Sequence, residues 1–344
     1  MAIMVHSFRD SVERWLGNIL PADLYVRSNA NLGQKEQSLM QSMAGVSRVN
    51  FLRSMEISLQ ATQPNITIVG RSFDDGSLNE ALPFTGPVQT MNLPSSTNTI
   101  AVYISEAMVD LYQWQIGQTI ASPINSQEIK QWFVAGIWRD YGRQHGTVAM
   151  ALSDLARITG NSAATDAALW KAPNTSSEQI TQELKKLNFL NAAEFRSSES
   201  IRTISLKVFD RSFALTYIIE AIAIAVALFG VASVYGADSL SRKREFATLA
   251  HIGVSSTTIT LQVAIEALLG LLVAVIWGAI VGIGLAWILI RRINPQSFHW
   301  SMDFSWPVGL LLSCSIALIL LGVVSALLAY RSSITLNAVQ AIRS

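Results

Sequence analysis

Three long stretches of this chain are almost free of charge. Residues 212–237 contain a single acid, Glu220; residues 252–290 contain a single acid, Glu266; and residues 304–330 contain no charged residue. Each stretch exceeds the roughly 20 apolar residues needed to cross about 30 Å of hydrocarbon. Buried helices of a large soluble core are the alternative, but such helices usually keep a polar face. We therefore predict three membrane spans.

The residues before position 212 have the composition of a water-facing domain. They hold 18 of the 25 Lys and Arg residues and 19 of the 24 Asp and Glu residues, so the segment is close to neutral. A near-neutral segment without a basic run does not indicate nucleic-acid binding. The single cysteine, Cys314, lies inside the third stretch, so no intrachain disulfide is expected. The four histidines lack the spacing of metal ligands.

Basic residues predict the orientation in the membrane. Five lie in the loop between the first two spans and in the C-terminal tail: Arg242, Lys243, Arg244, Arg331 and Arg343. The loop between the second and third spans has two, Arg291 and Arg292. Because cytoplasmic loops carry the excess of Lys and Arg, the first loop and the tail are predicted to be cytoplasmic. The large domain then lies outside, in the periplasm of a bacterium, and the protein lies in the plasma (inner) membrane.

The N-terminal segment, residues 1–20, does not resemble a signal peptide. Met1 to Val5 is apolar but too short to cross a membrane. We expect it to be the outer end of an upstream span, which would make the chain the second half of a longer permease. The following residues, including Trp15, place their apolar side chains on one helical face. Such a helix suits the membrane interface, and it suits equally a helix packed on its own domain.

The water-facing domain, residues 21–200, is predicted to be α+β. Its base, residues 21–72 and 162–198, follows a split βαβ pattern. We expect its strands at 23–27, 46–59, 66–69, 167–170 and 192–196, and its helices at 34–43 and from Ser177. A β-rich lobe, residues 73–161, is inserted between the two parts of the base. Its strands are expected at 99–104, 132–137 and 147–151, with a helix at 106–112.

Catalytic motifs are missing from the sequence. It contains no nucleophile elbow, no HExxH, no paired cysteines and no glycine-rich phosphate loop. We therefore expect no catalytic residue, no metal site and no enzyme activity in this chain. Gly278 and Gly282 form a GxxxG inside the second stretch, a spacing typical of close helix packing.

The segment between the first two spans has the most specific pattern. In SLSRKREFATLAHIGVSS, residues 239–256, apolar residues recur at helical spacing behind three basic residues. This predicts a short amphipathic helix at the cytoplasmic membrane surface, whose apolar face needs a surface to cover it. A solvated basic stop-transfer sequence would explain Arg242 to Arg244 but not the apolar face.

Here the chain resembles the FtsX-like permeases of ABC transporters, the group that includes MacB, LolC and LolE. The family pattern is S-x-x-R-x-R-E-[FIL]-A-x-L-R-A-[IL]-G-[AV]-[ST]. The matching residues are Ser239, Arg242, Arg244, Glu245, Phe246, Ala247, Leu249, Ile252, Gly253, Val254 and Ser255. Ala250 and His251 replace the usual Arg-Ala, and Asn337-Ala338 replaces a common Asp-Pro near the end. A glutamate in the next span of the family corresponds to Glu266.

The resemblance implies a non-catalytic permease subunit with a MacB-like periplasmic domain. ATP would be bound and hydrolysed by a separate cytoplasmic ABC ATPase, since this chain has no GxxxxGK[ST]. The helix after the first span would dock on that ATPase, which makes these the expected coupling residues: Arg242, Arg244, Glu245, Phe246, Leu249 and Gly253. Another permease half or a second copy, together with membrane lipid, would complete the assembly. Substrates of the family include lipids and lipoproteins.

The resemblance also divides the membrane part of the chain. We expect a stalk and first span at 201–237, a coupling loop at 238–258, spans at 259–290 and 306–330, an external loop at 291–305, and a tail at 331–344. Glu220 and Glu266 would be costly in lipid as ionised acids. They are expected to make a structural hydrogen bond or to relay conformational change. The alternative function is a membrane-anchored sensor or structural protein that works without an ATPase.

Overall fold

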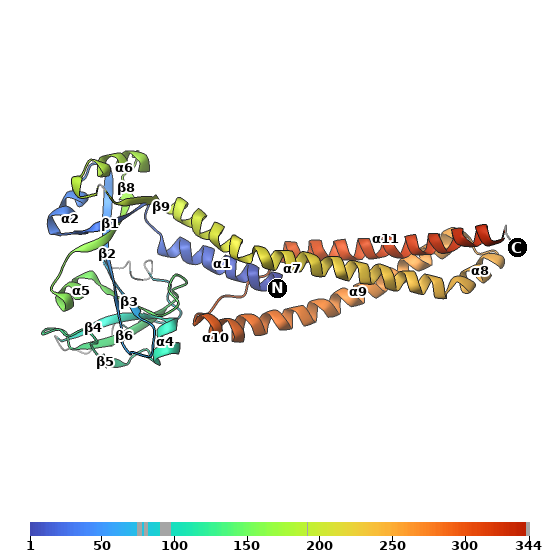
Figure 1. The fold of residues 1–344 in the computed structure, drawn as a ribbon, viewed down its shortest axis with the longest axis horizontal. Helices are drawn as coiled ribbons and strands as arrows, with labels where there is room; N and C mark the ends of the chain where they lie inside the picture. The colour runs from blue at the N-terminus through green and yellow to red at the C-terminus, as the bar shows by residue number, and fades with distance from the viewer. Residues whose placement is uncertain (74–77, 79–81, 90–97, 191, 342–344) are drawn as a thin grey trace. The chain divides into compact units, whose positions relative to one another are not determined.

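The computed structural model describes residues 1–341 apart from 74–77, 79–81, 90–97 and 191 (Figure 1). Arg343, one of the predicted cytoplasmic basic residues, lies outside this range. The chain divides into two compact units. One consists of residues 8–209 and 290–303, and the other of residues 1–7, 210–289 and 304–344. The first unit holds the sheet domain, and the second holds most of the long apolar helices.

The sheet domain is built on one mixed sheet, in which the described strands follow the order β5-β6-β4-β7-β3-β2-β8-β1-β9. The strands are β1 (Leu24–Leu32), β2 (Val46–Ile57), β3 (Ile66–Arg71), β4 (Thr99–Ser105), β5 (Thr119–Ala121), β6 (Gln131–Trp138), β7 (Thr147–Ala151), β8 (Ala164–Lys171) and β9 (Glu194–Ser197). The predicted strands are confirmed, with shifts of a few residues at their ends. The three-residue β5 was not predicted.

The base of the domain joins antiparallel strands and two helices. β8 pairs with both β1 and β2, and β9 pairs with β1. Helices α2 (Gln34–Gln41) and α6 (Ser177–Lys185) supply Met40, Ile180 and Leu184 to a buried cluster with Val26 and Phe51 of the sheet. A capping box at Ser176 and Gln179 satisfies backbone donors at the start of α6. These contacts cover one face of the base.

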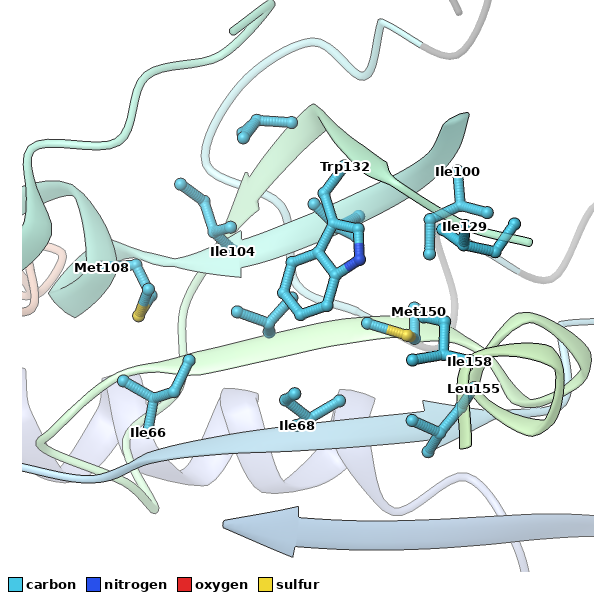
Figure 2. Packing of buried hydrophobic residues seen from close by; sticks show 13 residues of the cluster. Ile66, Ile68, Ile100, Ile104, Met108, Ile129, Trp132, Met150, Leu155 and Ile158 are labelled. Atoms are coloured by element: carbon cyan, nitrogen blue, oxygen red, sulfur yellow. The ribbon is translucent and has the colours of Figure 1, made fainter. Parts of the chain in front are cut away.

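The inserted segment continues the same sheet through a parallel pairing of β3 with β7. Helix α4 (Glu106–Tyr112) follows β4, and α5 (Leu152–Thr159) follows β7. The sequence did not predict α5, because its eight residues follow β7 with no turn residue between the two elements. A cluster of buried hydrophobic residues lies in this part of the domain, with the fully buried Trp132 in its middle (Figure 2). The cluster comprises Ile66, Ile68, Ile100, Val102, Ile104, Met108, Ile129, Trp132, Val134, Val148, Met150, Leu155 and Ile158.

The N-terminal segment forms one helix, α1 (Ala2–Ile19). In the sheet-domain unit, the Trp15 indole nitrogen donates a hydrogen bond to the Arg139 carbonyl at 3.0 Å, and the Trp15 ring contacts Tyr141. Ile19 packs beside the cluster around Trp138. For residues 8–19 these contacts favour the helix packed on its own domain over the helix lying in the membrane interface.

Among the residues that the structure describes, three helices are long and apolar enough to cross a membrane: 198–238, 256–298 and 308–331. They belong to α7 (Ser198–Ser241), α9 (Ser256–Ile288) with the short α10 (Asn294–Phe298), and α11 (Val308–Ala341). A five-residue π-helical segment, Leu289–Ile293, joins α9 to α10. α7 runs for 44 residues without interruption, about 66 Å, which is twice the hydrocarbon thickness. The predicted fold class, a mixed α/β domain with three apolar helices, is confirmed.

Candidate functional site: the turn between the first two spans

The segment between α7 and α9 forms the short helix α8 (Lys243–His251), as the sequence predicts. Gly253 ends it at φ +92°, a left-handed conformation that favours glycine. The Val254 N–H donates to the Leu249 carbonyl at 3.1 Å, the bond that closes a Schellman motif. Ser255 then caps α9 by accepting from the Thr258 N–H at 3.2 Å. Gly253 therefore has a backbone role in this turn, distinct from the predicted docking role.

Arg242 ties this turn to the second span. Its guanidinium donates to Glu266 at 2.7 Å and to Glu245 at 3.1 Å, and it lies 3.7 Å from Asp238. The hydrogen bonds to Glu266 and Glu245 raise the pKa of Arg242 above its ordinary value. Glu266 thus has a cationic partner within its own chain, although its side chain is 54% exposed.

Phe246 faces the bundle of its own chain. It is 7% exposed, and its ring meets Tyr330 of α11 edge-on at 5.1 Å. Arg242 lies over the same ring at 5.3 Å. The surrounding cluster consists of Ile259, Val263, Ala267, Ala326 and Tyr330, with Tyr235, Leu249, Val254, Val323 and Leu327 at its margin. Within this chain, the surface that covers the apolar face of α8 is therefore formed by α9 and α11.

This packing shows how the expected docking residues lie within the chain, and their contact with an ATPase stays a prediction. Arg242, Phe246 and Leu249 lie inward, and Gly253 shapes the turn. The hydrophobic spacing predicted a buried face correctly but carries no information about which molecule buries it. The outward face holds Arg244, Glu245, Thr248, His251 and Ile252, all of them exposed. Ile252 is 72% exposed, so this face offers an apolar contact within a polar surround.

The described residues show no close helix contact at Gly278 or Gly282, and the close packing predicted for them stays a prediction. Apart from their chain neighbours and the nearby backbone of α9 itself, no described atom lies within 4 Å of a Cβ built at either position. Gly322 of α11 makes the close approach instead, because a Cβ there would lie 2.6 Å from Leu271 of α9. The GxxxG therefore lies on a side of α9 that the described residues leave uncovered.

Glu220 differs from Glu266. It lies on α7 and is partly exposed, and among the described residues it has neither a hydrogen-bond partner nor an ion-pair partner. None of the residues in the apolar stretch of α7 that could cross a membrane is buried in this chain. α7 therefore presents most of its surface, including an acid, to whatever surrounds it.

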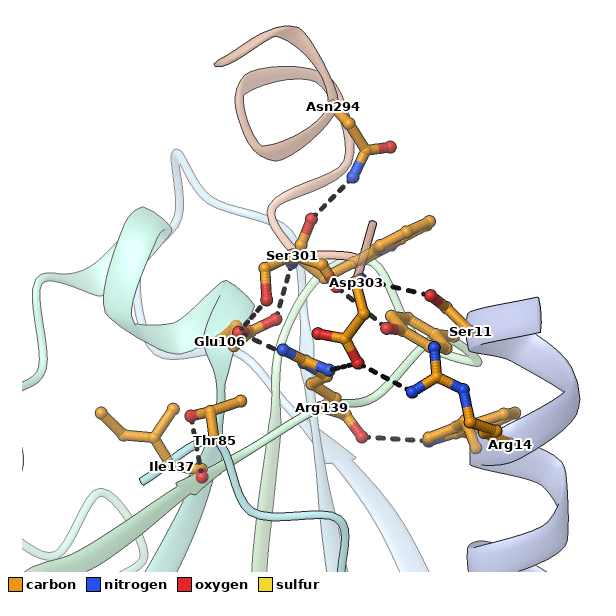
Figure 3. Close-up of polar contacts among 12 residues, drawn as sticks. Ser11, Arg14, Thr85, Glu106, Ile137, Arg139, Asn294, Ser301 and Asp303 are labelled. Atoms are coloured by element: carbon orange, nitrogen blue, oxygen red, sulfur yellow. Dashed lines mark hydrogen bonds and ion pairs between the residues drawn. The ribbon is translucent and has the colours of Figure 1, made fainter. Parts of the chain in front are cut away.

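A second polar cluster lies in the sheet-domain unit, where residues 290–303 contact the domain (Figure 3). Arg139 donates to Asp303 at 2.8 Å, and Arg14 of α1 reaches the same carboxylate at 3.2 Å. Glu106 accepts from the Ser301 N–H at 2.7 Å and from its hydroxyl at 2.6 Å. We call Arg14, Glu106, Arg139, Ser301 and Asp303 the loop clamp.

The pKa values of the two carboxyl groups of the loop clamp, Glu106 and Asp303, shift in opposite directions. Burial raises the pKa of Glu106, and the hydrogen bonds from Ser301 and the charge of Arg139 offset this only in part. The hydrogen bond from Arg139 lowers the pKa of Asp303. Burial alone would lower the pKa of Arg139, but its bond to Asp303 and the nearby charges raise it. Asp303 is therefore the ion-pair partner of Arg139, whereas Glu106 mainly holds the Ser301 backbone.

Aromatic contacts and a further ion pair extend this region. Trp300 is 4% exposed and lies against Phe8 at 4.8 Å, Tyr141 at 4.6 Å and Phe298 at 5.4 Å between ring centres. Tyr141 donates to the Ser301 carbonyl at 2.9 Å, and His299 pairs with Asp110. The sequence analysis did not identify these residues. Apart from the contact between Phe298 and Trp300, the partners lie more than 150 positions apart, so no local spacing reveals them.

The comparisons with known proteins agree with the membrane part of the structure. Residues 217–338 match the family model described as the FtsX-like permease C-terminal domain, a range that includes α8 and all of its intrachain contacts. These residues are therefore similar to the C-terminal domain of the FtsX-like permeases. An uncharacterised ABC transporter permease of Mycobacterium tuberculosis is 24% identical over 313 residues, which cover 88% of this chain and 36% of that protein. This chain thus spans about a third of the relative's length.

Solved structures resemble the sheet domain. The periplasmic region of MacB from Actinobacillus actinomycetemcomitans aligns with a TM-score of 0.38 and 15% identity, covering 55% of this chain and 94% of that one. The extracellular domain of the noncanonic ABC-type transporter YknZ from Gram-positive bacteria aligns with a TM-score of 0.33 and 13% identity, covering 51% and 98%. The family-model match over residues 217–338 and the three apolar helices indicate a multi-pass protein of the bacterial plasma membrane.

Proposed function

We propose that this permease couples a cytoplasmic ATPase, carried by another chain, to conformational change in its sheet domain outside the membrane. The observation that supports the proposal most is the construction of α8. Arg242, Phe246 and the Gly253 turn fix this helix on α9 and α11, while Thr248, His251 and Ile252 stay exposed. A helix held firmly on one side and exposed on the other is suited to transmit a displacement.

The proposed orientation places α8 in the cytoplasm and the sheet domain in the periplasm. Four basic residues of the described chain, Arg242, Lys243, Arg244 and Arg331, lie on the α8 side, against Arg291 and Arg292 on the other. ATP acts through the partner, because this sequence has no phosphate-binding loop. The proposed cargo is a lipid, lipoprotein or other hydrophobic molecule that is exported or extracted from the membrane.

The proposed assembly contains a second permease half or a second copy of this chain. Glu220 and the glycines at positions 278 and 282 support this, since no described helix of this chain covers them. An acid in a lipid-facing position is costly, so a neighbouring helix or water would accommodate Glu220. Membrane lipid covers the remaining apolar surface of α7.

Co-purification tests the ATPase partnership. We expect the full-length permease to retain an ABC ATPase from its native membrane, and Ile252→Asp to reduce the retained ATPase by about tenfold, as an apolar anchor at an interface contributes about 1–2 kcal/mol. Leu39→Asp, at an exposed leucine of α2, is the matched control and should change nothing. If the unmodified permease retains no ATPase under crosslinking, the sensor function replaces this proposal.

A further inference from the structure

The sheet of the base has a second face that α2 and α6 do not cover. Strand alternation places Val26 and Phe51 in the core with these helices and turns Tyr25 and Leu52 to the other side. A cavity of about 540 Å³ lies on that side, bounded by the C-terminal half of α1. Small-molecule sites in proteins have volumes of roughly 300–1,000 Å³.

One wall of the cavity is apolar and aromatic. Trp15 and Ile19 of α1, Leu82 and Trp138 line it. Trp138 is 2% exposed, and its indole nitrogen already donates to the Tyr103 carbonyl at 3.2 Å. Trp15 donates to the Arg139 carbonyl. Because both indole N–H groups are engaged elsewhere, the two rings offer hydrocarbon surface to an occupant.

The lining of the cavity is also rich in guanidinium groups. The described lining residues include five arginines, at positions 27, 53, 71, 143 and 196, and three acids, at positions 140, 166 and 194. Each acid is already engaged by one arginine: Arg143 with Asp140 at 3.1 Å, Arg27 with Asp166 at 3.0 Å, and Arg196 with Glu194 at 3.3 Å. The formal charge of these lining residues is therefore positive, by two.

Arg71 and Arg143 are two of these five lining arginines. Burial lowers the pKa of Arg71, and the positive charge of Arg143 lowers it further, against the opposing effects of Tyr25 and Asp140. Asp140 is itself satisfied, since it also accepts from the Thr147 hydroxyl at 2.7 Å and the Gly142 N–H at 3.0 Å. An anion placed here would relieve the repulsion between the two guanidinium groups.

We propose that this cavity binds an amphipathic anion. Its hydrocarbon part packs against Trp15 and Trp138, and its carboxylate or phosphate group lies at Arg71 and Arg143. Guanidinium groups suit both head groups, because they present paired donors in a plane. The site does not depend on ATPase coupling, so a failure of this inference leaves the proposed function standing.

Binding to the full chain in phosphatidylcholine nanodiscs tests the proposal. Octyl phosphate is titrated by calorimetry, with empty nanodiscs subtracted, beside octyltrimethylammonium and inorganic phosphate. We expect saturable binding of octyl phosphate at one site. The cation with the same chain and phosphate without a chain should each bind at least about tenfold more weakly, because each lacks one half of the recognition.

Two variants locate the site. Arg71→Gln should weaken octyl phosphate binding by at least about tenfold. Ser54→Trp, at an exposed lining residue, should block the cavity without removing a buried contact, and Ser54→Ala should not. Arg157→Gln, at an arginine of α5 outside the cavity, is the charge-matched control. Absence of saturable binding, equal binding of the cation, equal binding of phosphate alone, or unchanged binding in Ser54→Trp would each overturn the proposal.

Discussion

Arg242 and Arg139 each stand among carboxylates, yet the two clusters are built in different ways. Asp238 and Glu245 lie within four positions of Arg242, and Glu266 is 24 positions away. Arg139 pairs with Asp303, 164 positions away, and Glu106 binds Ser301, 195 positions away. Glu266 is 54% exposed, whereas Glu106 is 18% exposed. The first cluster is mostly local in sequence, and its carboxylates are exposed in this chain; the second is long-range, with Glu106 its most buried carboxylate.

This difference determines which residues carry stability. Exposed ion pairs contribute about 0–1 kcal/mol, so the carboxylates around Arg242 orient the α8 turn more than they stabilise it. The packing of Phe246 provides the larger part there. In the loop clamp the charges themselves matter, because removing one partner leaves another buried without compensation. The α8 turn should therefore be most sensitive to changes in volume, and the loop clamp to changes in charge.

The largest effect is expected at Phe246. Phe246→Asp removes an aromatic ring and places a carboxylate in its cluster, which should destabilise the local fold by about 3–5 kcal/mol. Hydrogen–deuterium exchange of peptides from α8 should accelerate by more than about a hundredfold, while exchange in β3 stays unchanged. Ile252→Asp is the matched control on the outward face. Equal acceleration in both variants would contradict the inward orientation of Phe246.

Arg139→Gln should have the next largest effect. It leaves Asp303 and Glu106 without their shared cation, a loss of about 2 kcal/mol given that Asp303 is partly exposed. Exchange of residues 299–303 should accelerate by about thirtyfold. The comparison variant is Arg242→Gln, for which we expect less than about fivefold at α8. A larger effect at position 242 than at position 139 would reverse the contrast between the two clusters.

Sequence reasoning succeeded where periodicity or local spacing carries the signal. The spans, most strands, α2, α6 and the position of α8 follow from patterns within windows of about 20 residues. It placed Phe246 on a buried face, but amphipathicity does not identify the covering surface. Within this chain α9 and α11 cover that face, and docking on an ATPase stays a prediction. Sequence reasoning did not predict the loop clamp. Arg14, Glu106, Arg139 and Asp303 meet only through tertiary structure, and each alone resembles an ordinary surface charge.

A moderate effect is expected at the end of α8. Gly253→Ala forces a side chain into the left-handed conformation at φ +92° and should cost about 1 kcal/mol. Exchange at the last turn of α8 should rise by about fivefold. Gly17→Ala serves as the control, because Gly17 lies inside α1 with nothing within 4 Å of an added Cβ. That change should be neutral or slightly stabilising. Unchanged exchange in Gly253→Ala would contradict a stabilising role of the Schellman motif at the end of α8.

The smallest effect concerns pH at the loop clamp. Glu106 has a raised pKa, so its favourable contribution is complete below its unfolded value of about 4.3 and is lost as pH rises through the folded value. Asp303 has a lowered pKa, so its contribution is present above about 3.9 and is lost as pH falls through the folded value. Glu106→Gln should abolish the loss of stability at rising pH and keep the loss of stability at falling pH. Exchange of residues 299–303, corrected for intrinsic rates, measures both; an unchanged pH profile would contradict the opposed shifts.

Site-specific photocrosslinking from α8 tests the central claim, that this helix is fixed on its own chain by one face and docks on an ATPase by the other. A photoreactive residue is placed in native membranes at Thr248 or Ile252, and in parallel at Phe246 or Leu249. From positions 248 and 252 we expect crosslinks to a separate chain that contains a GxxxxGK[ST] motif. Positions 246 and 249 should give only intrachain crosslinks to α9 or α11. Crosslinks to the ATPase from positions 246 and 249, with none from 248 and 252, would contradict it.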